Sequence, residues 1–168
     1  MVYVIYDQEE ALSLSDRVAV MRDGHVLQVA VPKVLYERPS TRFVADFVGT
    51  NNFIAGVCRE TTGAHCSVET PLGMLKSLAT PAVAPGAACV VVVRPENLTL
   101  DGGGENVLQG KVVLASYLGS VLRYDVATAE GPVLKVDVRD PWHHVPLPPG
   151  QSVRVTFSPS DGLTLAGE

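Results

Sequence analysis

The segment from position 111 to position 123 contains the residue types that hold a tetrahedral oxyanion: hydroxyl groups, a glycine amide and two cationic side chains. The candidate ligands are Lys111, Ser116, Gly119, Ser120 and Arg123. The same residues fit a structural interpretation, because a glycine between two apolar runs is typical of a tight turn or bulge. Turn glycines are far more common than anion pockets, so the turn is favoured and the anion site remains the alternative.

Metal binding and redox chemistry have little support in the sequence. The adjacent His143 and His144 point to opposite faces of an extended chain, and the other histidines lie in distant segments. The three cysteines, Cys58, Cys66 and Cys89, form no C-x-x-C pair. We therefore expect no metal site and no cofactor, and we expect buried, reduced thiols in a cytoplasmic protein.

The sequence also offers no phosphate-binding loop. The nearest match, GGGENVLQGK at 102–111, has Glu105 where such a loop requires its first glycine. Val112 follows the lysine, where serine or threonine is required. ATP hydrolysis needs backbone amides, a lysine and Mg²⁺ together on the phosphates, so we expect this chain not to be an enzyme.

Composition limits the classes of function further. The chain has 168 residues, of which 46% are hydrophobic and 18% charged, as expected for a globular protein. A net charge of -5 and an aromatic content of 6% argue against a basic, aromatic-lined surface for nucleic acid. No apolar run approaches the roughly 18 residues of a membrane span, so no direct membrane insertion is expected.

The first 51 residues are predicted to form a small region of helices and a hairpin. Asp7 has the profile of a helix N-cap with Glu10 as its reciprocal partner, so this acidic cluster indicates a cap rather than an acid–base pair. Asp23-Gly24 between two apolar runs predicts a β-hairpin. Two short helices follow, the second with Ser40 as its predicted cap.

From residue 52 the sequence changes to short segments rich in valine and leucine, separated by glycine and proline. The predicted strands are 53–59, 64–70, 73–79, 87–94, 107–118, 121–128, 132–139 and 152–157. Alternation in VLKVDVR and SVRVTF indicates strands with one buried face. Many such strands predict a small β-barrel or sandwich, and DGGG at 101–104 is interpreted as a hinge between two groups of strands.

Two parts of the chain resemble a known family. YDQEEALSLSDRVAVMRDGHVLQVAVPKVLYERPSTRFVADFVGTNNF closely resembles the last part of the ATPase subunit of ATP-binding cassette importers for polyamines, sulfate, ferric iron and sugars. VVVRPENLTL and NVLQGKVVLASYLGSVLRYDV resemble the transport-associated OB-like (TOBE) domain that follows the ATPase core. The resemblance implies a mostly β protein, with a short α+β remnant of the ATPase domain at 1–51. A TOBE barrel of OB-like or MOP-like type is implied at 52–168, and some relatives of this domain bind oxyanions.

The resemblance also identifies a remnant of the family's switch loop at Tyr6, Asp7, Gln8 and Glu9, as matches to motif positions rather than active groups. The family normally has histidine at the position of Tyr6, and a phenol that titrates near pH 10 is a poor substitute. The phosphate loop, glutamine loop, signature motif and catalytic carboxylate belong upstream of the matched part. ATP and Mg²⁺ are therefore expected only in the complete family.

The function implied by the resemblance is a non-catalytic regulatory or dimerisation region of an importer's ATP-binding subunit. In the complete family its partners are the membrane permease subunits at the cytoplasmic face of the membrane. A homodimer is expected, because apolar strand edges near the N-terminus would need a cover. The alternative function is a stand-alone barrel that senses a small oxyanion, which a thermal-shift panel would detect.

Overall fold

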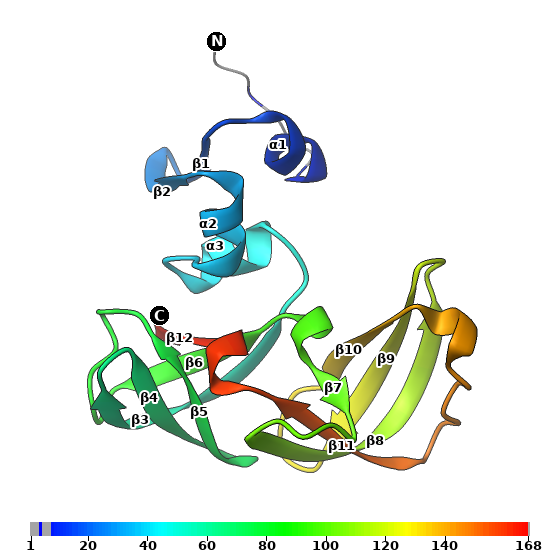
Figure 1. The fold of residues 1–168 in the computed structure, drawn as a ribbon. Coiled ribbons are helices and arrows are strands. Elements are labelled where there is room, and N and C mark those ends of the chain that lie inside the picture. Colours follow the sequence, from blue (N-terminus) through cyan, green and yellow to red (C-terminus); the bar gives the residue numbers. More distant parts are fainter. Residues whose placement is uncertain (1–3, 5–7, 168) are drawn as a thin grey trace. The chain divides into compact units, whose positions relative to one another are not determined.

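The computed structural model describes residue 4 and residues 8–167, without the side chains of Gln8 and Glu9. The predicted helix cap at Asp7 lies outside the described residues. The chain divides into two compact units, Met1–Thr50 and Asn51–Glu168, which are described separately below (Figure 1). No helix in the described part of the chain is long and apolar enough to cross a membrane.

The first unit consists of short helices around a β-hairpin. Its elements are α1 (Gln8–Leu14), β1 (Val18–Arg22), β2 (His25–Ala30), α2 (Pro32–Glu37) and α3 (Arg42–Phe47). The predicted hairpin is confirmed, and Asp23 and Gly24 both have the positive φ that its two-residue turn requires, 51° and 80°. The prediction that Ser40 caps the last helix is wrong. Thr41 is the cap, and its hydroxyl accepts a hydrogen bond from the Val44 amide at 3.2 Å.

The described part of the second unit is almost entirely β-structure. The strands of its first half are β3 (Asn52–Thr62), β4 (His65–Thr70), β5 (Gly73–Ala79), β6 (Ala88–Val93) and β7 (Thr99–Leu100), with η1 (Pro95–Asn97) before the last. The second half contains β8 (Asn106–Tyr117), β9 (Val121–Thr128), β10 (Leu134–Arg139), η2 (Pro141–His143), β11 (Ser152–Phe157), η3 (Pro159–Asp161) and β12 (Gly162–Ala166). The predicted mostly β class is confirmed, although β7 and β12 were not predicted.

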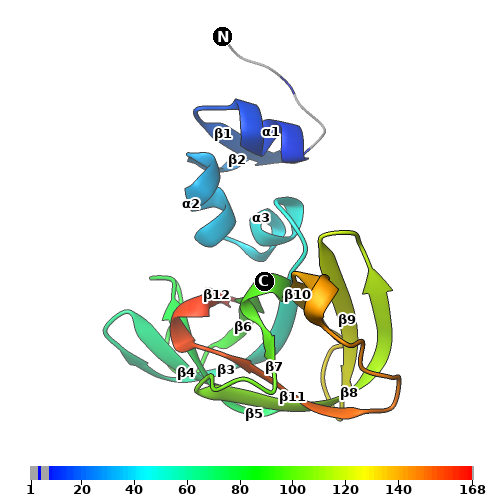
Figure 2. The ribbon, with the colours of Figure 1, turned by 45° about the vertical axis from the view of Figure 1, so that its right-hand side comes forward.

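The two halves repeat the same topology and exchange their last strands. In the first half the strand order is β6-β3-β4-β5, and in the second it is β11-β8-β9-β10. The last strand of the second half, β12, pairs with β5 and β6 and closes the first half into a barrel. In return, β7 pairs with β11 of the second half, as both ribbon views show (Figures 1 and 2). Each half therefore depends on the other for its last strand.

The repeat extends to the backbone irregularities of the first strand in each half. Both β3 and β8 contain a bulge, after Cys58 and after Val112 respectively. Two residues before each bulge is a glycine, Gly56 or Gly110, where a Cβ atom would lie only 2.5 Å from its nearest neighbour on the adjacent strand. The close approach explains the glycines, because no other residue type leaves room for the partner strand.

Candidate functional site

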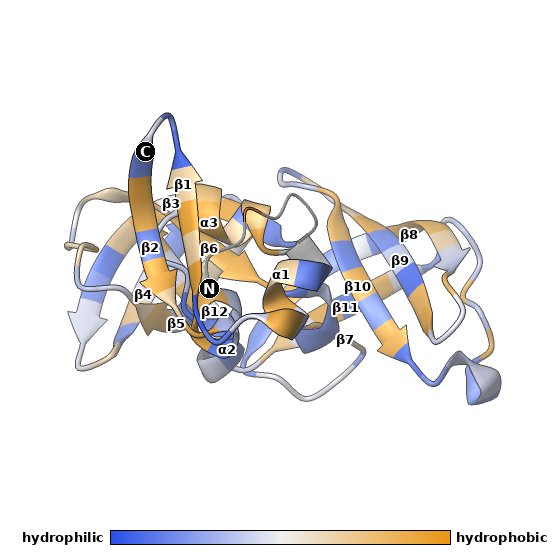
Figure 3. Cartoon of the chain, turned by 90° about the horizontal axis from the view of Figure 1, so that it is seen from above, coloured by the Kyte–Doolittle hydropathy of each residue, from blue (hydrophilic) through white to orange (hydrophobic). Residues whose placement is uncertain are grey.

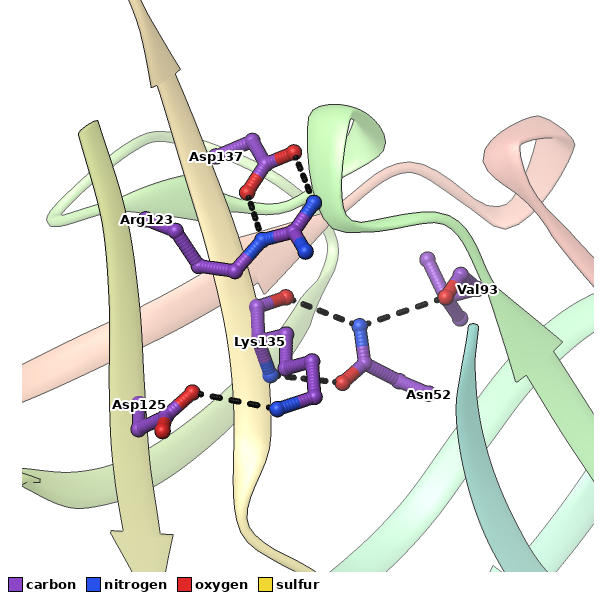
Figure 4. Close-up of polar contacts among 6 residues, drawn as sticks. All are labelled: Asn52, Val93, Arg123, Asp125, Lys135 and Asp137. Carbon is purple, nitrogen blue, oxygen red and sulfur yellow. Dashed lines mark hydrogen bonds and ion pairs between the residues drawn. The ribbon is translucent and has the colours of Figure 1, made fainter. Parts of the chain in front are cut away.

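Arg123, the main cation of the predicted anion site, is bound to a carboxylate of the neighbouring strand. Arg123 on β9 and Asp137 on β10 are directly opposite each other. The guanidinium donates from Nε to one carboxylate oxygen at 2.7 Å and from Nη2 to the other at 2.8 Å (Figure 4). The side chains are 27% and 10% exposed. Hydrogen bonding to Asp137 raises the pKa of Arg123, so the guanidinium stays charged.

A second ion pair lies next to the first on the same two strands. Lys135 on β10 is opposite Asp125 on β9, and its ammonium group lies 3.3 Å from the Asp125 carboxylate (Figure 4). The two neighbouring pairs therefore place alternating charges on one face of β9 and β10. Because each cation has a carboxylate beside it, this face neutralises its own charge and has little attraction left for an external anion.

The structure brings together only part of the predicted anion site. Ser116 lies opposite Arg123 in the β8–β9 pair, and Gly119 and Ser120 form the turn that joins these strands. Gly119 has φ 85°, and the Leu118 amide donates to the Val121 carbonyl across the turn at 2.8 Å. These are the features of a two-residue hairpin turn that begins with glycine, as the turn interpretation of the sequence expects.

Lys111 lies apart from the other candidate ligands. It is opposite Ala127, five residues before Ser116 on the same strand, or roughly 17 Å along the strand at 3.4 Å per residue. The remaining candidates thus offer two hydroxyl groups, a turn amide and a cation that is already bound by Asp137.

Two asparagines that the sequence analysis did not identify join the halves of the second unit. Asn52 begins β3, and its carboxamide bonds the backbone of Lys135 on β10, accepting from the amide at 2.7 Å and donating to the carbonyl at 2.9 Å (Figure 4). It also donates to the Val93 carbonyl of its own half at 3.2 Å. The side chain therefore acts like a short strand on the edge of β10.

Asn106, the first residue of β8, makes the equivalent contacts from the second half to the first. Its carboxamide accepts from the Lys76 amide at 2.7 Å and donates to the Lys76 carbonyl at 2.9 Å on β5. It also lies within hydrogen-bonding distance of the Phe157 carbonyl. Asn52 and Asn106 are both 3% exposed, so these reciprocal contacts are shielded from water and fix one half against the other.

The cysteines are buried in the barrel on three different strands, β3, β4 and β6. Burial raises the pKa of Cys89 to about 11, and burial also raises that of Cys58, with the nearby Cys66 adding to the effect. Protonated thiols of this kind are poor nucleophiles and poor metal ligands. Among the described residues, no group of three or more His, Cys, Asp or Glu side chains is arranged to hold a metal ion.

The other candidates from the sequence either contact neighbouring side chains or lie, wholly or in their side chains, outside the part that the structure describes. The ring nitrogen Nε2 of His144 lies 2.7 Å from the hydroxyl of the buried Tyr124, which also accepts from the Leu147 amide. This contact holds the segment after β10 on the sheet. Tyr6 and Asp7 lie outside the described residues, and Gln8 and Glu9 begin α1 with side chains that are not described.

Comparison with known proteins finds relatives that cover both units of the chain. Residues 91–165 match the family model of the TOBE domain. The chain is 38% identical over 170 residues to the spermidine/putrescine import ATP-binding protein PotA of Rubrobacter xylanophilus, and the match covers 99% of this chain and 45% of the relative. It is 34% identical over 156 residues to the Fe(3+) ions import ATP-binding protein FbpC 1 of Rhizobium meliloti, covering 93% and 43%. The chain therefore spans less than half the length of these relatives.

A solved structure supports the architecture of the second unit. The molybdate-bound form of the cytoplasmic molybdate-binding protein ModG aligns with a TM-score of 0.60 and 18% identity, covering 69% of this chain and 96% of that chain. At this level of identity the likeness shows the fold alone. It confirms the predicted OB-like barrel architecture.

Proposed function

Since nearly the whole chain is similar to the C-terminal part of the ATP-binding subunits of ATP-binding cassette importers, we propose that it is the non-catalytic regulatory and dimerisation region of such a subunit. The observation that carries the proposal is the extent of the match, because it covers 99% of this chain and therefore includes both units. In the complete transporter this region would act with the membrane permease subunits at the cytoplasmic face of the membrane.

The chemistry of the described residues supports a non-catalytic role. The cations of the β9–β10 face are paired with carboxylates, and burial raises the pKa of the Cys58 and Cys89 thiols. The second unit instead has the properties of a rigid body, because its halves exchange strands and are joined by two buried asparagines. A rigid body of this kind is suited to fixing the relative orientation of subunits, and not to catalysis.

Dimerisation has a suitable surface at one end of the second sheet. The turn after β8 and the segment after β10 are neighbours there, because Arg139 pairs with Val121. Tyr117 and Leu118 on one side, and Trp142 and Val145 on the other, are large apolar side chains that are more than half exposed. The exposed surface of these four side chains is on the order of 500 Å² in total, comparable to the largest apolar patch of a typical monomer. We propose that a second copy of the chain covers it.

The test is a chimera in which this chain replaces the matched 45% of the R. xylanophilus relative. We expect the chimera to hydrolyse ATP, to form a dimer, and to lose both the dimer and the normal regulation of its ATPase rate when residues 51–168 are deleted. We also expect the isolated chain to have twice its 17.8 kDa mass in light scattering, and Trp142→Ser to reduce it to a monomer. ATP turnover by the isolated chain, or a deletion without effect on mass and rate, would contradict the proposal.

A further inference from the structure

The connection from β10 to β11 is longer than its counterpart from β5 to β6 in the first half. Both connections reach the same anchor at the bulge of the first strand. In the first half the Gly86 amide donates to the Cys58 carbonyl at 2.7 Å. In the second half the Gly150 amide donates to the Val112 carbonyl at 2.7 Å. The two glycines are therefore equivalent positions of the repeat.

The extra residues form an arm, which we define as residues 140–146 and which includes η2. Val83 and Leu147 each lie three residues before the anchoring glycine, and both pack on the core of the second unit. Lys76 and Lys135 are the equivalent residues that the two asparagines bind. Val83 comes seven positions after Lys76, whereas Leu147 comes twelve positions after Lys135. The second half therefore has five additional residues here.

The arm is held on the second sheet by a buried hydroxyl group. Tyr124 on β9 is 0% exposed, and its hydroxyl accepts a hydrogen bond from the Leu147 amide at 3.0 Å. The same hydroxyl lies 2.7 Å from Nε2 of His144, which belongs to the arm. The first half, which lacks the arm, has Cys66 at the equivalent position of β4. The hydroxyl and the arm thus occur together in the second half.

The hydrogen bonds of Tyr124 require the neutral form of His144. A phenol has one hydrogen to donate, and the Leu147 amide already donates to its oxygen. Among the described residues Nε2 is the acceptor in contact with this hydroxyl, so the O–H donates to Nε2 and the hydrogen of the imidazole lies on Nδ1. Protonation places a second hydrogen on Nε2. Two donors then meet, and the buried hydroxyl hydrogen has no acceptor.

The strands beside this contact present apolar side chains to it. The cross-strand neighbours of Tyr124 are Ala115 on β8 and Val136 on β10. The charged residues of these strands alternate with the buried ones and therefore point to the opposite face, as the alternating colours along β9 and β10 show (Figure 3). These charged residues are Lys111, Arg123, Asp125, Lys135, Asp137 and Arg139.

Few titratable groups lie on the same side as His144. Asp140 and His143 belong to the arm, and Tyr117 ends β8. Tyrosine and aspartate side chains ordinarily keep one charge state between about pH 5 and about pH 8, whereas imidazole changes its charge there. The exposed His143 has no hydrogen bond to the sheet among the described contacts, so His144 is the histidine whose protonation opposes the contact.

We propose that the hydrogen bond between Tyr124 and His144 is a pH-sensitive clasp, which holds the arm on the sheet while the imidazole is neutral and releases it when the imidazole is protonated. The inference rests on the proposed function, because the arm carries Trp142 and Val145 of the surface that a second copy covers. It names the regulation of that surface: acid weakens the dimer by releasing the arm.

The test is ¹⁵N NMR relaxation of the full chain, read at the backbone amides of the arm. We expect order parameters of about 0.85 at about pH 7.5 and below about 0.6 at about pH 5.5. The strands should keep about 0.85 at both values. This readout does not depend on whether the chain is a monomer or a dimer. Light scattering over the same range should show the mass of the dimer falling to that of one chain.

Three variants separate the clasp from a merely structural contact. The carboxamide oxygen of His144→Gln still accepts from Tyr124 but does not titrate, so its arm should stay ordered at both pH values. Tyr124→Phe keeps the ring and loses the hydroxyl, so its arm should be mobile at both. The matched control is His143→Gln, which removes the neighbouring exposed histidine and should respond to acid like the unmodified chain.

The proposal is overturned if the arm of the unmodified chain keeps its order in acid, or if His144→Gln loses that order equally. It is also overturned if His143→Gln abolishes the response, or if the dimer persists in acid although the arm is released. A chain that is monomeric at both pH values, with an arm that still responds to acid through His144, refutes the proposed dimer and supports the clasp.

Discussion

Replacing Arg123 by glutamine tests whether its guanidinium is a structural group of the second sheet or part of an anion site. In the structure both oxygens of Asp137 accept hydrogen bonds from Arg123, and the Asp137 side chain is only 10% exposed. The change removes the charge partner and both hydrogen bonds, and it leaves a carboxylate at a position that water reaches poorly. Arg123→Gln should therefore destabilise the folded chain.

The magnitude follows from the burial of the pair. Removing one partner of a fully buried ion pair costs about 3–5 kcal/mol, and the 27% exposure of Arg123 reduces the expected cost to about 2 kcal/mol. The first half contains a matched control in the cross-strand pair of Arg59 and Glu69, whose side chains are 54% and 53% exposed. Arg59→Gln should cost less than about 0.5 kcal/mol, as for other surface pairs.

The assay is urea unfolding followed by circular dichroism. It compares Arg123→Gln, Arg59→Gln, Asp137→Asn and the double variant that combines Arg123→Gln with Asp137→Asn. The double-mutant cycle should give a coupling of about 1.5–2 kcal/mol between Arg123 and Asp137. In thermal unfolding, Arg123→Gln should lower Tm by roughly 4–8 °C. If Arg123→Gln costs no more than Arg59→Gln, the guanidinium is not held by Asp137 and is available to an external anion.

Three further predictions concern the duplicated unit. Gly110→Ala should cost about 1–3 kcal/mol in urea unfolding, because its Cβ would lie 2.5 Å from a Val126 methyl group and 2.8 Å from the Ala127 carbonyl oxygen. Gly103→Ala, with no atom within 4 Å of the added Cβ, should change stability by less than about 0.5 kcal/mol, and equal costs would contradict the packing. Asn106→Ala should cost about 2–3 kcal/mol, because it leaves the Lys76 amide and carbonyl without their partner, and an unchanged urea midpoint would show that Asn106 does not hold the two halves together. The folded-state pKa of Cys89 is about 11 and its ordinary value 9.0, so its unfolded thiol ionises first and the stability it contributes is lost as pH rises from 9 to 11. The stability of the unmodified chain relative to Cys89→Ala should therefore fall over that pH range, and a constant difference would show that the thiol titrates normally.

The features that the sequence predicted correctly are determined by neighbouring residues. The β1–β2 hairpin could be predicted because Asp23 and Gly24 tolerate the positive φ of its turn. The strands around Val136 and Val155 could be predicted because a strand with one buried face alternates its residues. Local patterns of this kind do not depend on where the rest of the chain lies.

The features that were missed depend on contacts between distant parts of the chain. Pairing of β12 with β5 joins residues more than eighty positions apart, and no local pattern specifies it. The glycine run at 101–104 was interpreted as a hinge, and it does connect β7 to β8. The sequence did not show that a Cβ at Gly104 would lie 2.7 Å from the Phe157 backbone, because glycine permits close packing as well as flexibility.

The polar contacts were missed for the same reason, although the sequence contains a usable signal. NFIAG at the start of β3 and NVLQG at the start of β8 place an asparagine and a glycine at the same spacing. Recognising this repeat would have identified Asn52 and Asn106 as equivalent residues. The partner of Arg123 was not predictable from the repeat, because the register of β9 and β10 decides that Asp137 lies opposite it.

The most direct test of the central claim is calorimetric titration of Mg-ATP into the purified 168-residue chain and into its Tyr6→His variant. If the nucleotide is bound by another part of the importer subunit, neither protein should produce saturable heat at millimolar Mg-ATP, even with the switch histidine restored. Stoichiometric binding of Mg-ATP by the chain alone, with a dissociation constant in the micromolar range, would contradict the account.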